Sequence, residues 1–144
     1  MSEINRAVSC FNEGFSCSQA IFSAFSEKLG VPRDLAFKIA SGFGGGMSRM
    51  GETCGAVTGA FMVIGLKYSS TSAKNVEAKE KTYTLVRDFA ERFKKLYGSL
   101  KCKELIHCDL ITPEDRELAK KKNIFNDLCQ KFVRSAAEIL KEIL

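Results

Sequence analysis

Apolar residues recur every three or four positions from residue 72 to residue 97, and this stripe constrains the fold more than any other feature. Such spacing places the apolar side chains on one face of an α-helix. Gly98 follows directly, and glycine commonly ends a helix. The segment therefore predicts a long amphipathic helix with one buried face. The residues of the stripe are Val76, Tyr83, Val86, Phe89, Ala90, Phe93, Leu96 and Tyr97.

A second stripe with the same spacing covers residues 124 to 143 and predicts a C-terminal helix in which Cys129 faces the core. No stretch has the alternation of a half-buried strand, and the 144 residues include only two prolines. We therefore expect an all-α protein. Its length fits a single domain over residues 1–144, built as a bundle of about five to seven helices.

Shorter helices are predicted in the rest of the chain. A first helix precedes Gly14, a second opens at Ser16 or Cys17, and a third follows Pro32. Thr112 is followed by a proline and two acidic residues, which is typical of a helix start with a hydroxyl N-cap.

Five glycines between residues 42 and 51 exclude a regular helix and predict a tight loop before Cys54. The spacing of glycines and Thr53 is similar to that of a phosphate-binding loop, but Glu52 stands where such a loop needs lysine. A carboxylate there would repel phosphate, and no strand precedes the loop. We therefore interpret the segment as a sharp turn that passes close to neighbouring helices.

Composition excludes several function classes. The net charge is +5, but 22 basic residues are interleaved with 17 acidic ones, so no basic arm is set apart for nucleic acid. The longest apolar stretch, residues 54–66, is shorter than the about 20 residues that cross a bilayer. Residues 1–14 lack the apolar run of a signal peptide. We expect a cytoplasmic protein with no membrane span and no nucleic-acid partner.

Six cysteines are many for a chain of this kind. In a reducing cytoplasm, cysteines usually pack, bind metal or take part in redox chemistry. No two of them have C-x-x-C spacing, so any cluster must be assembled in space. His107 is the only histidine, and Met47 and Met50 are interpreted as packing residues. The cysteines are Cys10, Cys17, Cys54, Cys102, Cys108 and Cys129.

Cys54 lies at the predicted start of a helix that carries Gly55 and Gly59. The free N–H groups and the dipole at a helix N-terminus stabilise a thiolate, which is the form that attacks disulfides and binds metals. Arg49 and Lys67 would add positive charge if either lay beside the sulfur. The two glycines, one turn apart, allow another helix to pack very close. The alternative is a small buried cysteine that only packs.

Four segments resemble a known family. They are FSCSQA at 15–20, SGFGGGMSRMGETCGAVTGAFMVIGLKY at 41–68, KEKTYTLVRDFAERF at 79–93 and GSLKCKEL at 98–105. Together they resemble the C_GCAxxG_C_C (CGAxxG) family of redox-active proteins over nearly the whole chain. The most specific element is the glycine loop that leads into Cys54-Gly55-Ala56-x-x-Gly59. The resemblance implies an all-helical domain with four characteristic cysteines, which map onto Cys17, Cys54, Cys102 and Cys129.

A similar domain occurs beside haem-binding segments in the split-Soret cytochromes, and this favours electron transfer. The chain itself has no C-x-x-C-H haem motif. The first hypothesis is therefore an iron–sulfur cluster held by the four characteristic cysteines, with zinc as a less favoured metal. Cys108, His107 and Cys10 are second-rank ligands. The glycines expected around the cofactor are Gly44, Gly45, Gly46, Gly55 and Gly59.

Two alternatives stay open. In the metal-free one, Cys54 is the nucleophile of a thiol–disulfide protein, Cys17 or Cys102 is its resolving partner, and no cofactor is needed. In the other, the chain is a zinc-stabilised or plain interaction domain. We expect a redox protein or a small-molecule electron carrier as partner, and a homodimer is left open.

Overall fold

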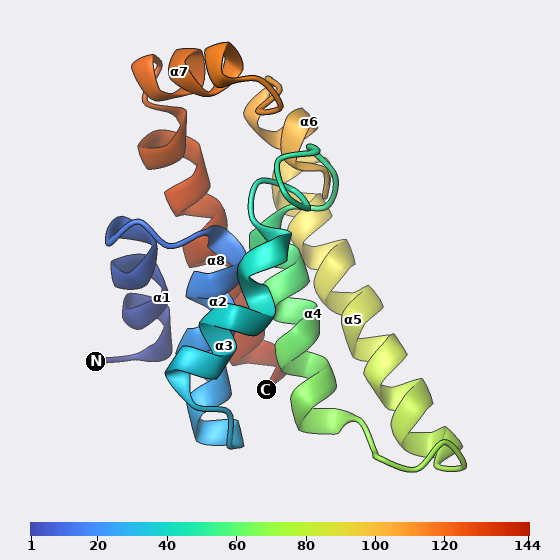
Figure 1. The fold of residues 1–144 in the computed structure, drawn as a ribbon. Coiled ribbons are helices and arrows are strands. Elements are labelled where there is room, and N and C mark those ends of the chain that lie inside the picture. Colours follow the sequence, from blue (N-terminus) through green and yellow to red (C-terminus); the bar gives the residue numbers. More distant parts are fainter.

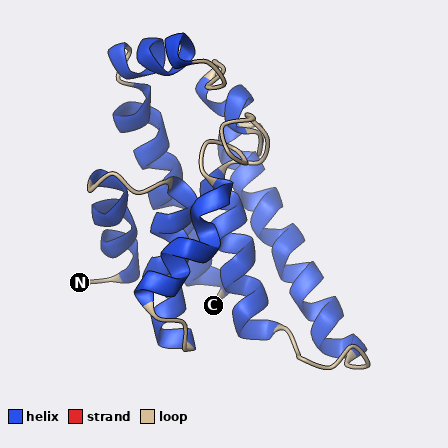
Figure 2. Cartoon of the chain, viewed as in Figure 1, coloured by secondary structure: helices blue, strands red, loops and turns tan.

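The computed structural model describes residues 1–144 and consists of helices and loops (Figure 1, Figure 2), which confirms the all-α prediction. The α-helices are α1 (Glu3–Asn12), α2 (Cys17–Ser26), α3 (Arg33–Ala40), α4 (Gly55–Tyr68), α5 (Val76–Tyr97), α6 (Cys102–Ile106), α7 (Pro113–Lys121) and α8 (Gln130–Ile143). Two short 3-10 turns, η1 (Glu27–Leu29) and η2 (Ser41–Phe43), and a π-helical turn, η3 (Phe125–Cys129), complete the set.

The helices α2 and α4 pack against each other at the centre of the bundle. Helix α5 covers α4, α1 and α3 flank α2, and α8 contacts α1, α2, α4 and α5. The largest fully buried side chains include Ile21, Ile64, Phe89, Phe93 and Leu140, which come from four of these helices. The helices α6 and α7 extend beyond this core at one end of the bundle (Figure 1).

Two glycines allow α4 to approach α2 closely. A methyl group added to Gly59 would lie 3.0 Å from the Cβ of Ile21 and 3.0 Å from the carbonyl oxygen of Ser18. One added to Gly55 would lie 2.9 Å from the backbone nitrogen of Ser18. The predicted close approach is therefore confirmed, and the helix that makes it is α2 of the same chain.

Capping residues define the start of two predicted helices. Ser16 Oγ accepts a hydrogen bond from the Gln19 backbone N–H, and the Gln19 side chain accepts one from the Ser16 backbone N–H. This reciprocal cap fixes Cys17 as the first residue of α2. Thr112 caps α7 by accepting from the backbone N–H of Asp115 at 3.1 Å. Both starts agree with the sequence.

Two details of the sequence prediction are corrected by the structure. The long helix begins at Val76 instead of Ser72, because Asn75 caps it by accepting from the Ala78 N–H. The short helix α6 was not predicted, and with it the bundle has eight α-helices instead of five to seven. A helix of five residues is too short to carry a periodic pattern.

Polar contacts tie together the start of α1, the turn η1 and the ends of α4 and α8. Glu3 accepts from Lys28 Nζ at 2.6 Å and from Lys141 Nζ at 2.9 Å, and it is only 8% exposed. These hydrogen bonds lower the pKa of its carboxyl to about 2. Lys67 Nζ and Tyr68 Oη donate to the backbone carbonyl groups of the last two residues.

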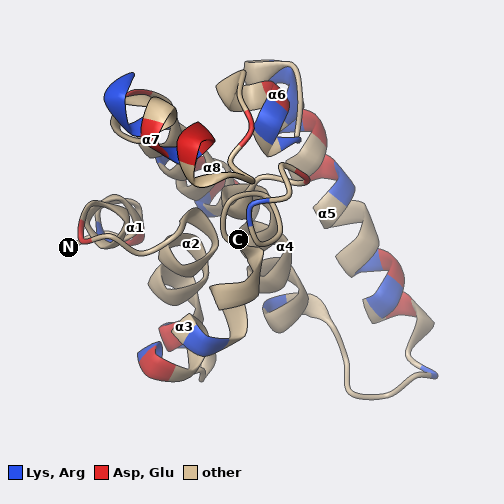
Figure 3. Ribbon diagram, turned by 45° about the horizontal axis from the view of Figure 1, so that its top comes forward, with Lys and Arg blue, Asp and Glu red and all other residues tan.

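Charge is unevenly distributed over the helices (Figure 3). Helix α2 carries no charged residue, and α4 carries only Lys67. In α5 and α7, acidic and basic side chains alternate. None of the helices combines the length and the apolar character needed to cross a bilayer.

Candidate functional site

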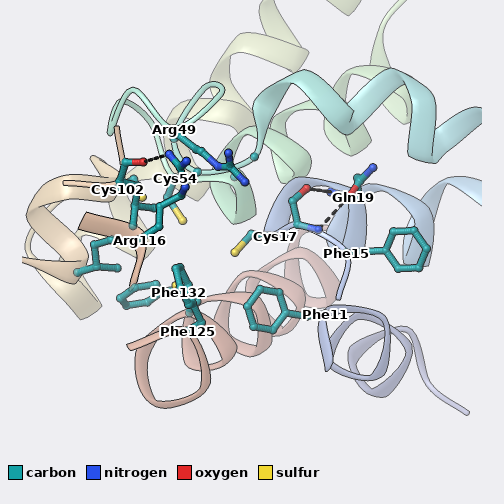
Figure 4. Close-up of a pocket in the computed structure, with 18 of the residues that line it drawn as sticks. Phe11, Phe15, Cys17, Gln19, Arg49, Cys54, Cys102, Arg116, Phe125 and Phe132 are labelled. Carbon is teal, nitrogen blue, oxygen red and sulfur yellow. Dashed lines mark hydrogen bonds between the residues drawn. The ribbon is translucent and has the colours of Figure 1, made fainter. Parts of the chain in front are cut away.

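A cavity of about 820 Å³ lies where the starts of α2 and α4 meet the glycine loop, α6, α7 and η3 (Figure 4). All four cysteines implied by the resemblance line it, although they are far apart in sequence: Cys17, Cys54, Cys102 and Cys129. The cavity therefore brings together the residues that local motifs could not connect.

Cys54 is the N-cap residue of α4. Hydrogen bonding with the Cys17 thiol lowers the pKa of Cys54 below its usual range, and the backbone N–H groups of Ala56 and Val57 lower it further. Burial opposes this shift, because Cys54 is only 4% exposed. The start of the helix therefore favours the thiolate of Cys54, as the sequence predicts.

Cys17 is the first residue of α2 and is half-buried. Its pKa is raised well above the usual value, first by hydrogen bonding with the Cys129 thiol, then by hydrogen bonding with Cys54 and by burial. Cys17 is therefore the neighbour that keeps its proton while Cys54 ionises. Of the two thiols, Cys54 is the stronger acid and Cys17 is the weaker one.

The loop before Cys54 has a left-handed backbone conformation over five consecutive residues. Every residue from Gly45 to Arg49 has a positive φ, between 52° and 70°, including the non-glycine residues Met47, Ser48 and Arg49. Such backbone costs about 1–2 kcal/mol for each residue with a side chain. Backbone hydrogen bonds within residues 43–52 offset this cost. The turn places Arg49 on the cavity wall.

A short antiparallel bridge joins this loop to the start of α6. The Cys54 N–H donates to the Leu100 carbonyl at 2.7 Å, and the Cys102 N–H donates to the Glu52 carbonyl at 2.6 Å. A methyl group on Gly46 would lie 2.5 Å from the Cβ of Cys102, so glycine is required there. The bridge is what brings Cys102 to Cys54.

Cys102 and Cys129 complete the group of four. Burial raises the pKa of Cys102 to about 12, and the negative charge of nearby cysteines adds to the shift. Cys129 ends the π-helical turn η3 and is 7% exposed. Turns of this kind are often found at functional sites. The predicted orientation of Cys129 towards the core is confirmed, and the same side chain also lines the cavity.

The second-rank residues lie outside the cavity wall. Cys10 is buried in the core, where its sulfur lies 3.8 Å from Ser23 Oγ, and burial raises its pKa. Cys108 is half-buried, and its pKa is also raised by burial. His107 is exposed, with a left-handed backbone that ends α6.

The predicted glycines divide into two groups. Gly44, Gly45, Gly46 and Gly55 line the cavity, whereas Gly59 lies against α2 one turn further along α4. Among these positions, Gly46 and Gly55 also make the close backbone contacts that hold the cysteines in place.

Of the two basic residues considered near Cys54, only Arg49 lines the cavity. Lys67 lies at the opposite end of α4 and donates to the carbonyl of Leu144 at 3.1 Å. Arg116 was not predicted as a site residue, and its guanidinium donates to the carbonyl groups of Leu110 and Ile111 beside the cavity.

Aromatic side chains form part of the wall and were also missed as site residues. They are Phe11, Phe15, Phe125 and Phe132 (Figure 4). In the sequence they belong to helical stripes or to a helix start, where an aromatic residue normally indicates packing.

Four thiolates are suitable donors for zinc or for an iron–sulfur cluster. As the side chains are placed, however, no three Cys, His, Asp or Glu residues form a group that could hold a metal ion. All six cysteines are free thiols. The sulfurs would therefore have to rearrange before they could bind a metal ion.

Comparison with known proteins identifies a family for this chain. No curated protein and no solved structure matches the chain. Residues 15–143 match the family described as "Putative redox-active protein (C_GCAxxG_C_C)". The matched region includes the glycine loop and all four cysteines of the cavity. The chain therefore belongs to the C_GCAxxG_C_C family.

Proposed function

We propose that this protein is a thiol-based redox protein in which Cys54 is the nucleophile and Cys17 is the resolving partner. The observation that carries the proposal is the position of the Cys54 sulfur at the start of α4, beside the Cys17 thiol. The neighbouring thiol and the helix N-terminus lower the pKa of Cys54 and so favour its thiolate, which is the reactive form of cysteine.

In the proposed reaction, the Cys54 thiolate attacks one sulfur of a disulfide substrate and forms a mixed disulfide, while the substrate S–S bond breaks and the first half of the substrate leaves as a thiolate. Cys17 then gives up its proton, attacks the Cys54 sulfur and releases the second half of the substrate. Two cysteine thiols are oxidised and one substrate disulfide is reduced to two thiols. The Cys17 and Cys54 sulfurs must then approach to the bonding distance of about 2.05 Å.

A cytoplasmic location belongs to this proposal, because a reducing compartment keeps six free thiols reduced. The partner would be a redox protein or a small-molecule carrier of electrons.

Electron transfer through an iron–sulfur cluster is the second candidate. One observation favours it: all four characteristic cysteines line the same cavity. It requires the four sulfurs to move into positions that bind iron, since no three ligands are grouped for a metal ion.

The test is the pH dependence of Cys54 alkylation in protein purified without oxygen, followed by mass spectrometry, with iron, zinc and acid-labile sulfide measured on the same sample. We expect Cys54 to be alkylated first and to titrate below the usual cysteine pKa. Cys17→Ala should raise the pKa of Cys54, because it removes the thiol whose hydrogen bonding lowers that pKa. Cys10→Ala, outside the cavity, is the matched control and should leave the titration unchanged.

Iron and sulfide near stoichiometry, lost on replacing any of the four cavity cysteines by serine, would establish the cluster instead. Alkylation of Cys54 no faster than that of Cys10 would overturn the thiol proposal.

A further inference from the structure

The size of the cavity and the depth of its sulfurs limit what can react there. Its volume of about 820 Å³ lies within the range of small-molecule sites. Cys54 is 4% exposed, and Cys102 and Cys129 are also buried. Attack on a disulfide requires the three sulfurs to line up, and a disulfide on the surface of a folded protein cannot reach so deep. A small molecule can enter the cavity.

The charge of the lining selects among small molecules. The lining includes three basic side chains, Arg49, Arg116 and Lys120, and one acidic side chain, Glu117. Arg116 is partly engaged with two backbone carbonyl groups. The guanidinium of Arg49 takes part in no hydrogen bond or ion pair of the structure, although the left-handed turn holds its backbone in place. A free guanidinium at a cavity wall suits a carboxylate.

The rest of the wall suits a hydrocarbon chain. Phe125 and Phe132 come from η3 and α8, and Leu105 and Ile106 come from α6. These four side chains border the cavity near Cys102 and Cys129, whereas Arg49 belongs to the glycine loop. The lining therefore combines apolar side chains near Cys102 and Cys129 with the guanidinium of Arg49 on the glycine loop.

We infer that the cavity binds a low-molecular-weight disulfide whose short apolar arms end in carboxylates, and that Arg49 holds one of these carboxylates. This inference rests on the proposed function and adds the class of substrate. The Cys54 thiolate attacks one substrate sulfur, and the leaving thiolate takes the electron pair of the broken S–S bond. Cys17 passes its proton to a leaving thiolate, attacks Cys54 and releases the second thiolate, so that one disulfide is exchanged for another.

The test compares three disulfides of similar length that differ in charge: 3,3′-dithiodipropionate, 2-hydroxyethyl disulfide and cystamine. We expect the reduced protein to react fastest with the anion and slowest with the cation, with about a tenfold difference between them. Arg49→Gln should remove this preference and Arg49→Lys should restore most of it. Arg87→Gln on the exposed side of α5 is the control and should leave the order unchanged.

Binding is measured separately from reaction. Suberate has the length of dithiodipropionate but no disulfide, and its binding to Cys54→Ser is followed by calorimetry. We expect binding that weakens about tenfold in the Cys54→Ser, Arg49→Gln double variant.

The two hypotheses fail in different ways. Slow reaction with all three disulfides, together with suberate binding that depends on Arg49, would overturn the thiol chemistry and keep the anion site. Fast reaction without a preference for the anion, or equal reaction with a disulfide on a folded protein, would overturn the substrate class and keep the thiol chemistry.

Discussion

At one end of the bundle, charged and polar side chains tie the helices together, whereas the other end is hollow and lined with thiols. The clamped end consists of five residues that join α1, η1, α4 and α8 through hydrogen bonds: Glu3, Lys28, Lys67, Tyr68 and Lys141. The cysteine end consists of the cavity and its four cysteines. Both ends share the central helices, so the difference lies in how each end is closed.

The covering elements differ as strongly as the ends themselves. Eight of the ten residues of α2 are buried, but Ala119 is the only buried residue among the nine of α7. The cysteine end is therefore rigid on the side of Cys17 and Cys54 and lightly held on the side of α7. A segment with little buried surface opens at a lower free energy than the core. Stability is thus concentrated on the side of Cys17 and Cys54, and α7 is the less stable wall of the cavity.

The largest expected effect on the free energy of unfolding is at Gly55, and Gly65 near the opposite end of α4 is the comparison. In Gly55→Ala the new methyl group would lie 2.9 Å from the backbone nitrogen of Ser18 and 3.2 Å from the Cβ of Cys17. We expect a loss of about 3 kcal/mol in the free energy of unfolding and slower alkylation of Cys54. Gly65→Ala meets no atom within 4 Å and should stabilise the helix by up to about 1 kcal/mol.

Urea unfolding of both variants checks this prediction. If both variants lost the same free energy of unfolding, close helix packing would not distinguish the cysteine end from the clamped end.

A smaller effect is expected at the clamped end. The carboxyl of Glu3 has a folded pKa of about 2, below its usual value of 4.5. Its contribution to stability is therefore present above about pH 4.5 and is lost as the pH falls towards 2. Glu3→Gln should cost about 2 kcal/mol at neutral pH, less than the full shift implies because both lysines are exposed to solvent.

The free energy of unfolding should be measured across this pH range. The values for Glu3→Gln and for the unchanged protein should converge as the pH falls. Alkylation of Cys54 should stay the same in the variant. A change in Cys54 reactivity would show that the two ends are coupled.

The smallest effect compares two helix caps of the same kind. Ser16→Ala removes the cap of α2 and should lower the free energy of unfolding by about 1 kcal/mol. Thr112→Ala removes the cap of α7, but we expect the free energy of global unfolding to fall by less than about 0.5 kcal/mol. Hydrogen exchange should instead become faster in the amides of α7. An equal loss in both variants would place α7 in the cooperative core.

The sequence predicted those features that depend on neighbouring residues. Helical stripes, the cap at Thr112 and the position of Cys54 at a helix start are local patterns, and the structure has all of them. Gly55 and Gly59 also indicated a close helix contact, which α2 makes.

The features that were not predicted from the sequence depend on contacts between residues that are distant in the sequence. Cys102 reaches the cavity through a backbone bridge to Glu52, and Arg116 reaches it because α7 folds back over the bundle end. Neither contact leaves a periodic pattern. The same is true of the π-helical turn at Cys129, which periodicity alone placed only in the core. Only the family resemblance identified Cys102 and Cys129 as members of the site.

The left-handed turn from Gly45 to Arg49 also predicts how related chains can vary. Three consecutive side chains occupy backbone that favours glycine, asparagine and aspartate and disfavours β-branched residues. Ser48 is held there by donating its hydroxyl hydrogen to the Gly42 carbonyl at 2.8 Å. Divergent sequences with the same turn should therefore exchange residues 47–49 for glycine, asparagine, aspartate or unbranched side chains, and valine, isoleucine and threonine should be absent from these positions.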